Sequence, residues 1–245
     1  MRTPLVLSSL AVALALTTGA ASRDELAAST GGSAEGFWVA SLPDGVHVKW
    51  AILDGGETWG VYEAAGTVLG AFHGQTRSAN GALEGSGQAY DIPSGNVGAA
   101  RFTGSYLPRQ AISLTTSFGV TLSGRYAPTY DEPASPGALT GRYDGEGLSS
   151  RRPLIALQLQ VAGDGDFIMT SREDCAASGR ITPRPGGRNI FDVSLHFAGA
   201  ACPLGDGARA SGIAHRSATS GELFMLAMNE TRTDGWLFLG QRSGD

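Results

Sequence analysis

FDVSLHF, residues 191–197, alternates apolar and polar residues at every step. Successive side chains of a β-strand point to opposite faces, so this period of two predicts a strand with one buried and one solvated face. VHVKW at 46–50 and IALQLQV at 155–161 alternate in the same way. The sequence therefore predicts an all-β protein built from half-buried strands.

Turn signals separate these apolar stretches. They are Asp54-Gly55-Gly56, Asn80-Gly81, Gly163-Asp164-Gly165, Gly186-Gly187 and Asp234-Gly235. Such short glycine-containing pairs and triplets favour tight hairpin turns between antiparallel strands. Because no segment after residue 21 keeps a helical period over three turns, we expect an antiparallel β-barrel or sandwich with little helix.

The two halves of the chain share a pattern at an offset of about 105 to 110 residues. Each half has a glycine-led start with an aromatic residue, Gly36-Phe37-Trp38 and Gly141-Arg142-Tyr143, followed by an alternating strand and a Gly/Asp turn. Hairpin chemistry can also produce such a match by chance. If the halves are related, the chain holds two β-domains, residues 37–127 and 139–242, joined by a Pro-rich linker at 128–138.

The first 21 residues have the pattern of an export signal. Arg2 precedes an apolar stretch from Leu5 to Leu16, and small residues follow at 19–21. The apolar stretch is shorter than the roughly 20 residues that cross a bilayer as a helix, and no later segment is long and apolar enough. We therefore expect an exported protein, periplasmic, in the cell envelope or secreted, that is not an integral membrane protein.

The residues around the expected cleavage site leave one alternative. Leu16-Thr17-Thr18-Gly19 is similar to the approach to a bacterial lipoprotein processing site, but Ala20 stands where the lipidated cysteine would be. The sequence favours a soluble product over a lipoprotein. Residues 22–36, rich in Ala, Ser, Gly and Thr, predict a flexible linker ahead of the first domain.

The charge balance argues against one class of partner. Without Arg2, 17 basic and 23 acidic residues remain, a formal charge of −6. Such a surface offers no electrostatic basis for binding nucleic acid.

The two cysteines, Cys175 and Cys202, predict one disulfide in an exported chain. The bridge would close a loop of about 28 residues, for which the chain-entropy estimate is roughly 3 to 4 kcal/mol. A metal site or a catalytic thiol is the alternative, but neither has supporting residues nearby.

The sequence predicts no catalytic residue, no metal ligand and no cofactor. The four histidines are His47, His73, His196 and His215, and none forms a His-x-His or His-Glu-x-x-His motif. No Gly-x-Ser-x-Gly motif is present either. A hydrolase site assembled from distant strands stays open as an alternative.

The end of the chain is apolar on both faces. Residues 223–228 (LFMLAM) and 236–239 (WLFL) flank the loop 229–235. A strand pair that is apolar on both sides is buried on both sides. The second cover is the other domain or the barrel interior, or else a protein partner or an apolar ligand.

Several features together resemble a group of poorly characterised proteobacterial envelope proteins. They are the export signal, the Gly/Ser linker, Gly36-Phe37-Trp38, the paired cysteines and the closing TDGWLFLG at 233–240. Many members of that group are lipoproteins with small antiparallel β-barrels. The resemblance implies location and fold and brings no catalytic residue. The missing lipidation cysteine departs from it and puts membrane tethering in doubt.

Three functions follow from these observations. The first is an exported non-enzymatic binding protein that presents exposed aromatics, Trp38, Trp59 and Tyr62, to a protein or glycan partner. The second is a carrier whose barrel interior holds a small apolar ligand, with Phe224 and Trp236 of the C-terminal hairpin as further candidate contacts. The third is a hydrolase. A continuous interior cavity of several hundred Å³ would favour the carrier.

Overall fold

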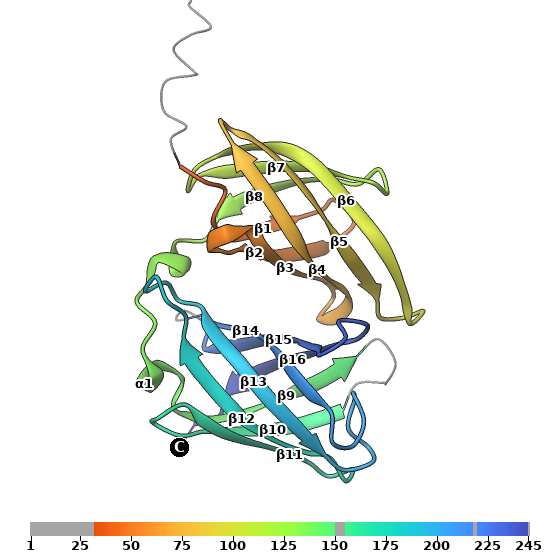
Figure 1. Ribbon diagram of the computed structural model, residues 1–245, viewed down its shortest axis with the longest axis vertical. Coiled ribbons are helices and arrows are strands. Elements are labelled where there is room, and N and C mark those ends of the chain that lie inside the picture. Colours follow the sequence, from red (N-terminus) through yellow and green to blue (C-terminus); the bar gives the residue numbers. More distant parts are fainter. Residues whose placement is uncertain (1–31, 150–154, 218–219, 245) are drawn as a thin grey trace, which may run out of the picture.

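The computed structural model describes residues 32–149, 155–217 and 220–244. The expected export signal and residues 22–31 of the expected linker lie outside these ranges. Two closed antiparallel barrels of eight strands each make up the fold, and Figure 1 shows them stacked one on the other. The prediction of an all-β fold with two related β-domains and little helix is confirmed.

The first barrel, called the N-barrel, consists of β1 (Gly36–Ser41), β2 (Val46–Ile52), β3 (Glu57–Ala64), β4 (Thr67–Ala79), β5 (Ala82–Asp91), β6 (Asn96–Leu107), β7 (Ala111–Thr116) and β8 (Thr121–Tyr126). The second, called the C-barrel, consists of β9 (Gly141–Ser149), β10 (Ile155–Val161), β11 (Asp166–Ser171), β12 (Ala176–Pro183), β13 (Phe191–Ala198), β14 (Arg209–Arg216), β15 (Glu222–Asn229) and β16 (Gly235–Arg242). The helical pieces are single turns, namely η1 (Asp54–Gly56), η2 (Pro128–Asp131) and α1 (Pro136–Leu139).

Each strand pairs with its neighbours in the chain, and the last strand pairs with the first. β8 closes the N-barrel on β1, and β16 closes the C-barrel on β9. The period-two stretches form β2, β10 and β13, and on β13 the apolar residues are buried while Ser194 and His196 are exposed. At the Asn80-Gly81 turn both residues have positive φ, as a type I′ hairpin turn requires.

The two barrels repeat each other in detail. Both begin at a glycine with positive φ, Gly36 and Gly141. In both barrels, the turn after the second strand contains a further glycine with positive φ, Gly56 in the N-barrel and Gly165 in the C-barrel. A Cβ added at Gly56 would lie 2.0 Å from a carbonyl oxygen of β4, and one at Gly165 would lie 2.1 Å from a carbonyl oxygen of β12. The pattern shared by the two halves of the sequence therefore reflects the same backbone constraint at corresponding positions of the two barrels.

One end of the N-barrel is closed by the chain segment that precedes β1. Ala34 is fully buried, its amide donates to Ser78 Oγ, and its carbonyl accepts from the Trp38 indole. Tyr106 donates to the carbonyl of Gly32 at 2.9 Å. Residues 32–36 therefore pack against the barrel, in contrast to the flexible linker that their composition predicts.

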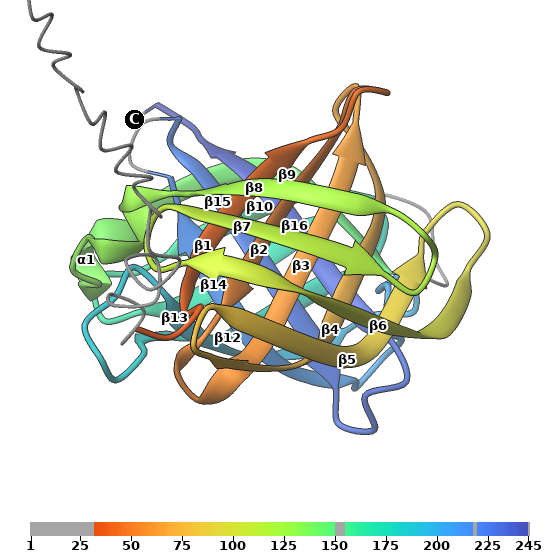
Figure 2. The same cartoon turned by 90° about the horizontal axis from the view of Figure 1, so that it is seen from above.

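The barrels meet through a cluster of buried apolar side chains from both. The N-barrel contributes outward-facing residues of β1 to β3, and the C-barrel contributes those of β14 to β16. Figure 2 shows that these two sets of strands cross one another. Phe224 and Leu226 belong to this cluster, whereas their neighbours Leu223 and Met225 lie inside the C-barrel. The second cover of the two-sided C-terminal hairpin is thus the N-barrel.

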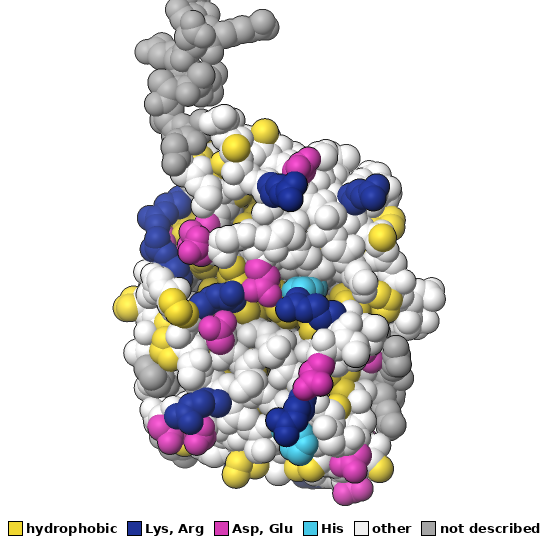
Figure 3. Space-filling model, viewed as in Figure 1, with side chains coloured by type: hydrophobic (Ala, Val, Ile, Leu, Met, Phe, Trp, Pro, Cys, Tyr) yellow, Lys and Arg dark blue, Asp and Glu magenta, His cyan; other side chains and the backbone are white. Residues whose placement is uncertain are grey.

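Charged side chains of both signs lie along the boundary between the barrels (Figure 3). Lys49 Nζ lies 3.1 Å from Glu222 Oε1, and Arg184 Nη2 lies 2.9 Å from Glu57 Oε2. Arg188 reaches Asp131 of η2 at 2.8 Å. The linker helix η2 is therefore held between the barrels rather than left as a free connection.

Candidate functional site

A cavity of about 410 Å³ lies within the N-barrel. Its wall is formed by inward-facing residues of β2 to β8, and almost all of the surface it presents is apolar. Val48, Tyr62, Phe72, Phe102 and Leu122 are among the lining side chains. An eight-stranded barrel is just wide enough either to be filled by its own side chains or to hold one small ligand, so the size of these side chains decides which.

Small residues keep this barrel open. Gly60, Ala89 and Ala100 line the cavity. The inward-facing ring of Phe102 lies against a glycine on the neighbouring strand: a Cβ at Gly85 would fall 2.1 Å from this ring. The ring therefore covers the wall instead of crossing the lumen.

The interior of the C-barrel, in contrast, is filled by side chains. Its interior is packed with aromatic and long aliphatic side chains, of which Tyr143, Phe191, Phe197, Trp236 and Phe238 are each at most 1% exposed. Trp236 packs between the rings of Phe197 and Phe238. Two barrels of one architecture thus differ in what occupies their centres.

The cavity reaches the surface at the end of the N-barrel opposite the buried Ala34. Leu42 and Asp44 of the β1–β2 turn and Phe118 and Val120 of the β7–β8 turn line it there. These turns lie at the right-hand end in Figure 2. Phe118 is 64% exposed and Val120 is 41% exposed, so apolar side chains continue from the wall to the outer rim.

The hydroxyl groups of the inner wall are hydrogen-bonded within the protein, whereas the buried indole N–H of Trp50 in the same wall has no hydrogen-bond partner among the described residues. Thr58 Oγ1 lies 2.6 Å from Thr76 Oγ1. The Tyr62 hydroxyl donates to the carbonyl of Tyr90 at 3.3 Å, and Thr116 donates to the carbonyl of Val120 at 3.2 Å. Burial is the main cause that raises the pKa of Tyr62, with the charge of Asp91 adding to it, so its hydroxyl stays protonated.

Of the five aromatic candidates, only Tyr62 lines this cavity. The expectation that Trp38 and Trp59 are exposed is wrong, because Trp38 is fully buried inside the closed end and Trp59 is 3% exposed between the barrels. Phe224 lies in the same interface and Trp236 in the C-barrel interior. The sequence analysis did not identify Phe72, Phe102 or the small residues opposite them as cavity residues. The sequence signal for the cavity was the glycines and alanines at inward positions of β3 to β6.

Among the described residues, the hydrogen bonds of the histidines do not bring an acid and a nucleophile together on one histidine. His47 Nδ1 lies 2.9 Å from Ser41 Oγ at an exposed site, whereas His73 Nε2 lies 3.5 Å from Glu57 Oε1 in a different place. His196 is exposed. His215 stacks on Phe37 between the barrels, and burial first, then the charge of Lys49, lowers its pKa to about 4.

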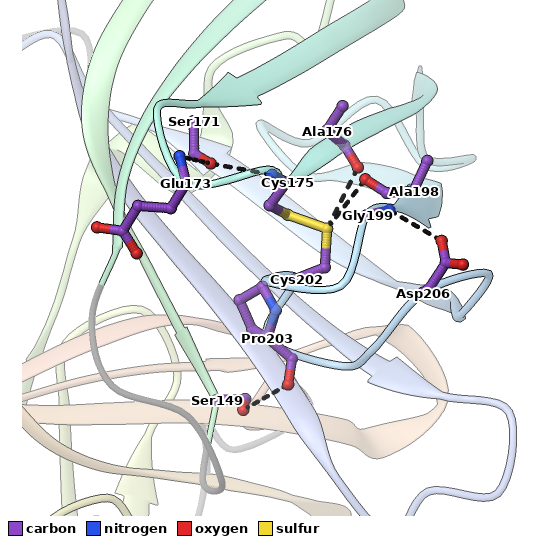
Figure 4. Close-up of a disulfide and its surroundings, with 10 residues drawn as sticks. All are labelled: Ser149, Ser171, Glu173, Cys175, Ala176, Ala198, Gly199, Cys202, Pro203 and Asp206. Atoms are coloured by element: carbon purple, nitrogen blue, oxygen red, sulfur yellow. Dashed lines mark hydrogen bonds between the residues drawn. A yellow bond between two sulfur atoms is a disulfide. The ribbon is translucent and has the colours of Figure 1, made fainter.

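The predicted disulfide between Cys175 and Cys202 is confirmed and lies in the C-barrel. It joins the start of β12 to the β13–β14 loop, with the two Cα atoms 4.7 Å apart (Figure 4). Nearby, Ser149 donates to the carbonyl of Pro203 at 3.1 Å. The bridge and this bond fix a long loop at one end of the C-barrel, away from the N-barrel cavity.

In the described part of the chain, no three His, Cys, Asp or Glu residues are grouped so that they could hold a metal ion. No helix within residues 32–149, 155–217 and 220–244 is long and apolar enough to cross a membrane. The disulfide is consistent with an exported protein. Comparisons with protein-family models, curated proteins and solved structures give no match to this chain.

Proposed function

We propose that the protein is an exported, non-enzymatic binding protein whose N-barrel carries a small apolar ligand. The observation that carries this proposal is the apolar cavity of about 410 Å³ in one barrel, beside a second barrel of the same architecture that is filled. Ligand pockets in proteins typically measure about 300 to 1,000 Å³ and are lined mostly by hydrophobic side chains. The cavity meets both criteria.

The C-barrel serves as a support in this proposal. It covers the outer faces of β1 to β3 with a buried apolar cluster and flanks that cluster with ion pairs such as Lys49–Glu222. The strands that form one side of the cavity are thereby braced from outside. A rigid wall lowers the conformational-entropy cost of binding, because fewer protein groups must become ordered around the ligand.

Two other functions have less support. A protein or glycan partner was expected to contact exposed aromatics, but Trp38 and Trp59 are buried. A hydrolase would need a histidine, an acid and a nucleophile together, and among the described residues the His47–Ser41 and His73–Glu57 contacts involve different histidines. The cavity therefore favours binding of a small molecule over these two functions.

Export is part of the proposal. The sequence pattern at 1–21 and the Cys175–Cys202 bridge both suit an oxidising compartment, in the periplasm, in the cell envelope or outside the cell. Ala20 in place of a lipidation cysteine favours a soluble carrier over a tethered one.

The test uses N-phenyl-1-naphthylamine, an uncharged apolar dye whose fluorescence rises in apolar surroundings. We expect saturable binding at one site per chain. Ala100 faces the cavity and Ala99 is exposed on the outer face of the same strand. Ala100→Phe should weaken dye binding by about tenfold or more because the ring fills the cavity, and Ala99→Phe should leave it unchanged.

Both variants are checked for folding by circular dichroism and thermal unfolding. If the dye does not bind to the wild-type protein, or binds equally to folded Ala100→Phe and Ala99→Phe proteins, the N-barrel is not the carrier site.

A further inference from the structure

One polar group in the wall of the N-barrel cavity lacks a partner. Trp50 lines the cavity and is 4% exposed, and its buried indole N–H forms no hydrogen bond within the part of the chain that the structure describes. The indole nitrogen is a donor only, and a buried tryptophan usually has an acceptor for it. An acceptor on a ligand would therefore gain this hydrogen bond without having to displace a protein group.

The hydroxyl groups of the same wall have already donated their hydrogens. Thr58, Tyr62 and Thr116 donate to the backbone carbonyls of Gly56, Tyr90 and Val120, respectively. Breaking any of these bonds would leave a buried carbonyl with one acceptor contact fewer, which costs free energy. Among the described side chains of the inner wall, the indole N–H of Trp50 is thus the donor that is left to a ligand.

Trp50 lies at the deep end of the cavity. Val46, Val48 and Trp50 line it from β2, and Val46 is the residue next to the turn that rims the mouth. The six-membered ring of Trp50 reaches β8, where a Cβ at Gly124 would fall 2.5 Å from it. The residue paired with Trp50 on β1 is Trp38, which belongs to the closed end and not to the lining. The Trp50 ring therefore forms part of the cavity floor.

The lining offers no inward-facing charge that could balance an ionic ligand group at this floor. Arg101 shares the outer face of β6 with Ala99, because alternation along the strand turns Ala100 inward. The other charged lining residue, Asp44, is an acid at the mouth, where it disfavours an anion. Burying an unpaired ion costs far more than burying a neutral acceptor that is hydrogen-bonded. An acceptor at the floor is therefore uncharged.

We infer that the ligand is an uncharged molecule with a hydrocarbon body and one carbonyl-type acceptor, a ketone or an ester, whose oxygen accepts from Trp50 Nε1 at the floor of the N-barrel cavity. This inference rests on the proposed carrier function and adds the ligand class to it. Burial of the hydrocarbon supplies most of the affinity, and the single hydrogen bond orients the ligand with its carbonyl end inward. A ketone or an ester brings no donor of its own that would need a buried partner.

The experiment compares two ligands of the same shape, undecan-2-one and 2-methylundec-1-ene, in which a C=CH₂ group replaces the C=O group. Displacement of N-phenyl-1-naphthylamine gives the ratio of their affinities. Trp50→Phe removes the donor and keeps an aromatic ring, and it should weaken binding of the ketone relative to the alkene by about fivefold. A change in cavity shape affects both ligands, so it largely cancels in this ratio.

Trp59→Phe is the matched control. Its indole N–H is also buried and has no hydrogen-bond partner in the described ranges, but Trp59 lies between the barrels and outside the cavity lining. We expect this variant to keep the wild-type ratio of ketone to alkene affinity.

A spectroscopic measurement on the wild-type protein does not depend on the folding of Trp50→Phe. The chain has four tryptophans, so isotope labelling of nitrogen gives a small set of indole N–H resonances, which single Trp→Phe variants assign. Saturation with undecan-2-one should move the Trp50 resonance downfield, because its hydrogen becomes hydrogen-bonded. Saturation with 2-methylundec-1-ene should not.

The outcomes distinguish the two levels of the proposal. If the dye and both ligands bind, but the affinity ratio is the same in wild-type and Trp50→Phe proteins or the Trp50 resonance responds equally to both ligands, the carbonyl is refuted and the apolar carrier stands. If undecanoate at about pH 8 displaces the dye better than undecan-2-one, the acceptor is not an uncharged group and the inference is overturned. If the dye itself does not bind, both levels fail together.

Discussion

The indole nitrogen of Trp38 lies 3.0 Å from the carbonyl oxygen of Ala34, four residues earlier, and this buried hydrogen bond closes one end of the N-barrel. The C-barrel repeats the device, with the hydroxyl of Tyr143 donating to the carbonyl of Leu139 at 3.1 Å. In both barrels, the chain that enters the first strand is folded back under the lumen.

Removing either bond should destabilise its own barrel. Trp38→Phe leaves the carbonyl of Ala34 without its donor, and Tyr143→Phe does the same for Leu139, so each should cost about 1 to 3 kcal/mol in urea unfolding. Trp38 does not line the cavity. Dye affinity of the folded Trp38→Phe protein should therefore match the wild type, and a large loss would place Trp38 in the binding site.

The disulfide should stabilise the C-barrel without affecting binding. Cys175→Ser combined with Cys202→Ser removes a bridge that spans 27 residues, which should lower the free energy of unfolding by roughly 3 kcal/mol. The melting temperature checks this. The cavity residues are all in the N-barrel, so dye titration at low temperature should be unchanged. An unchanged melting temperature under oxidising conditions would contradict the assignment of a stabilising role.

His215 should make the protein less stable in mild acid. Burial, and next the charge of Lys49, lowers its pKa from 6.5 to about 4. Between these values the unfolded chain binds a proton that the folded chain does not. The free energy of unfolding is therefore unaffected by His215 above pH 6.5 and decreases as the pH falls from 6.5 to about 4. Below about pH 4, His215 causes no further loss of stability. The total is roughly 3 kcal/mol.

His215→Phe tests this assignment, because phenylalanine can keep the stack on Phe37, whose ring centroid lies 4.3 Å from that of His215. Urea unfolding from pH 7 to pH 4 should show a smaller acid loss in this variant. His196→Gln, at an exposed site, should follow the wild-type curve. Equal acid loss in all three proteins would assign the effect to other groups.

Glu57 should stabilise the contact between the barrels down to strongly acidic pH. Its pKa is lowered from 4.5 to about 2 by the hydrogen bond with His73 and by Arg184, whose 2.9 Å contact is shorter than the 3.5 Å contact to His73. The ionised form stabilises the fold above pH 4.5, and this contribution is lost as the pH falls through about 2.

Glu57→Gln should lower stability by about 1 kcal/mol at pH 7, and the difference from the wild type should vanish as the pH approaches 2. Glu84→Gln is the control, because Glu84 is exposed and forms no ion pair with the described residues. Urea unfolding monitored at several pH values distinguishes the two. A difference that persists at pH 2 would mean that the carboxylate charge is not the cause.

The strands could be predicted from the sequence because their signals are local, and the disulfide because the chain has only two cysteines. The alternation at 191–197 and the glycine turns fix which residues face inward, and β13 follows them. Burial of Trp59 could not be predicted in this way. It lies on the outward face of β3, which the pattern assigns to solvent, but the C-barrel covers that face.

The cavity could not be predicted from local sequence patterns either. Alternation places Phe102 inward, but it does not tell whether the ring crosses the lumen or lies on the wall. That depends on Gly85, which faces Phe102 from the paired strand and is brought there only by the register of β5 and β6. The size of the lumen is therefore a property of cross-strand pairs rather than of any stretch of sequence.

Closure of β1 on β8 and of β9 on β16 has one more consequence. An open sheet ends in a strand whose unpaired N–H and C=O groups can add a strand from another molecule, which is a route to aggregation. In both barrels the first and last strands satisfy each other. Pairing of another chain with the described strands, or strand exchange between copies, would therefore require a barrel to open first.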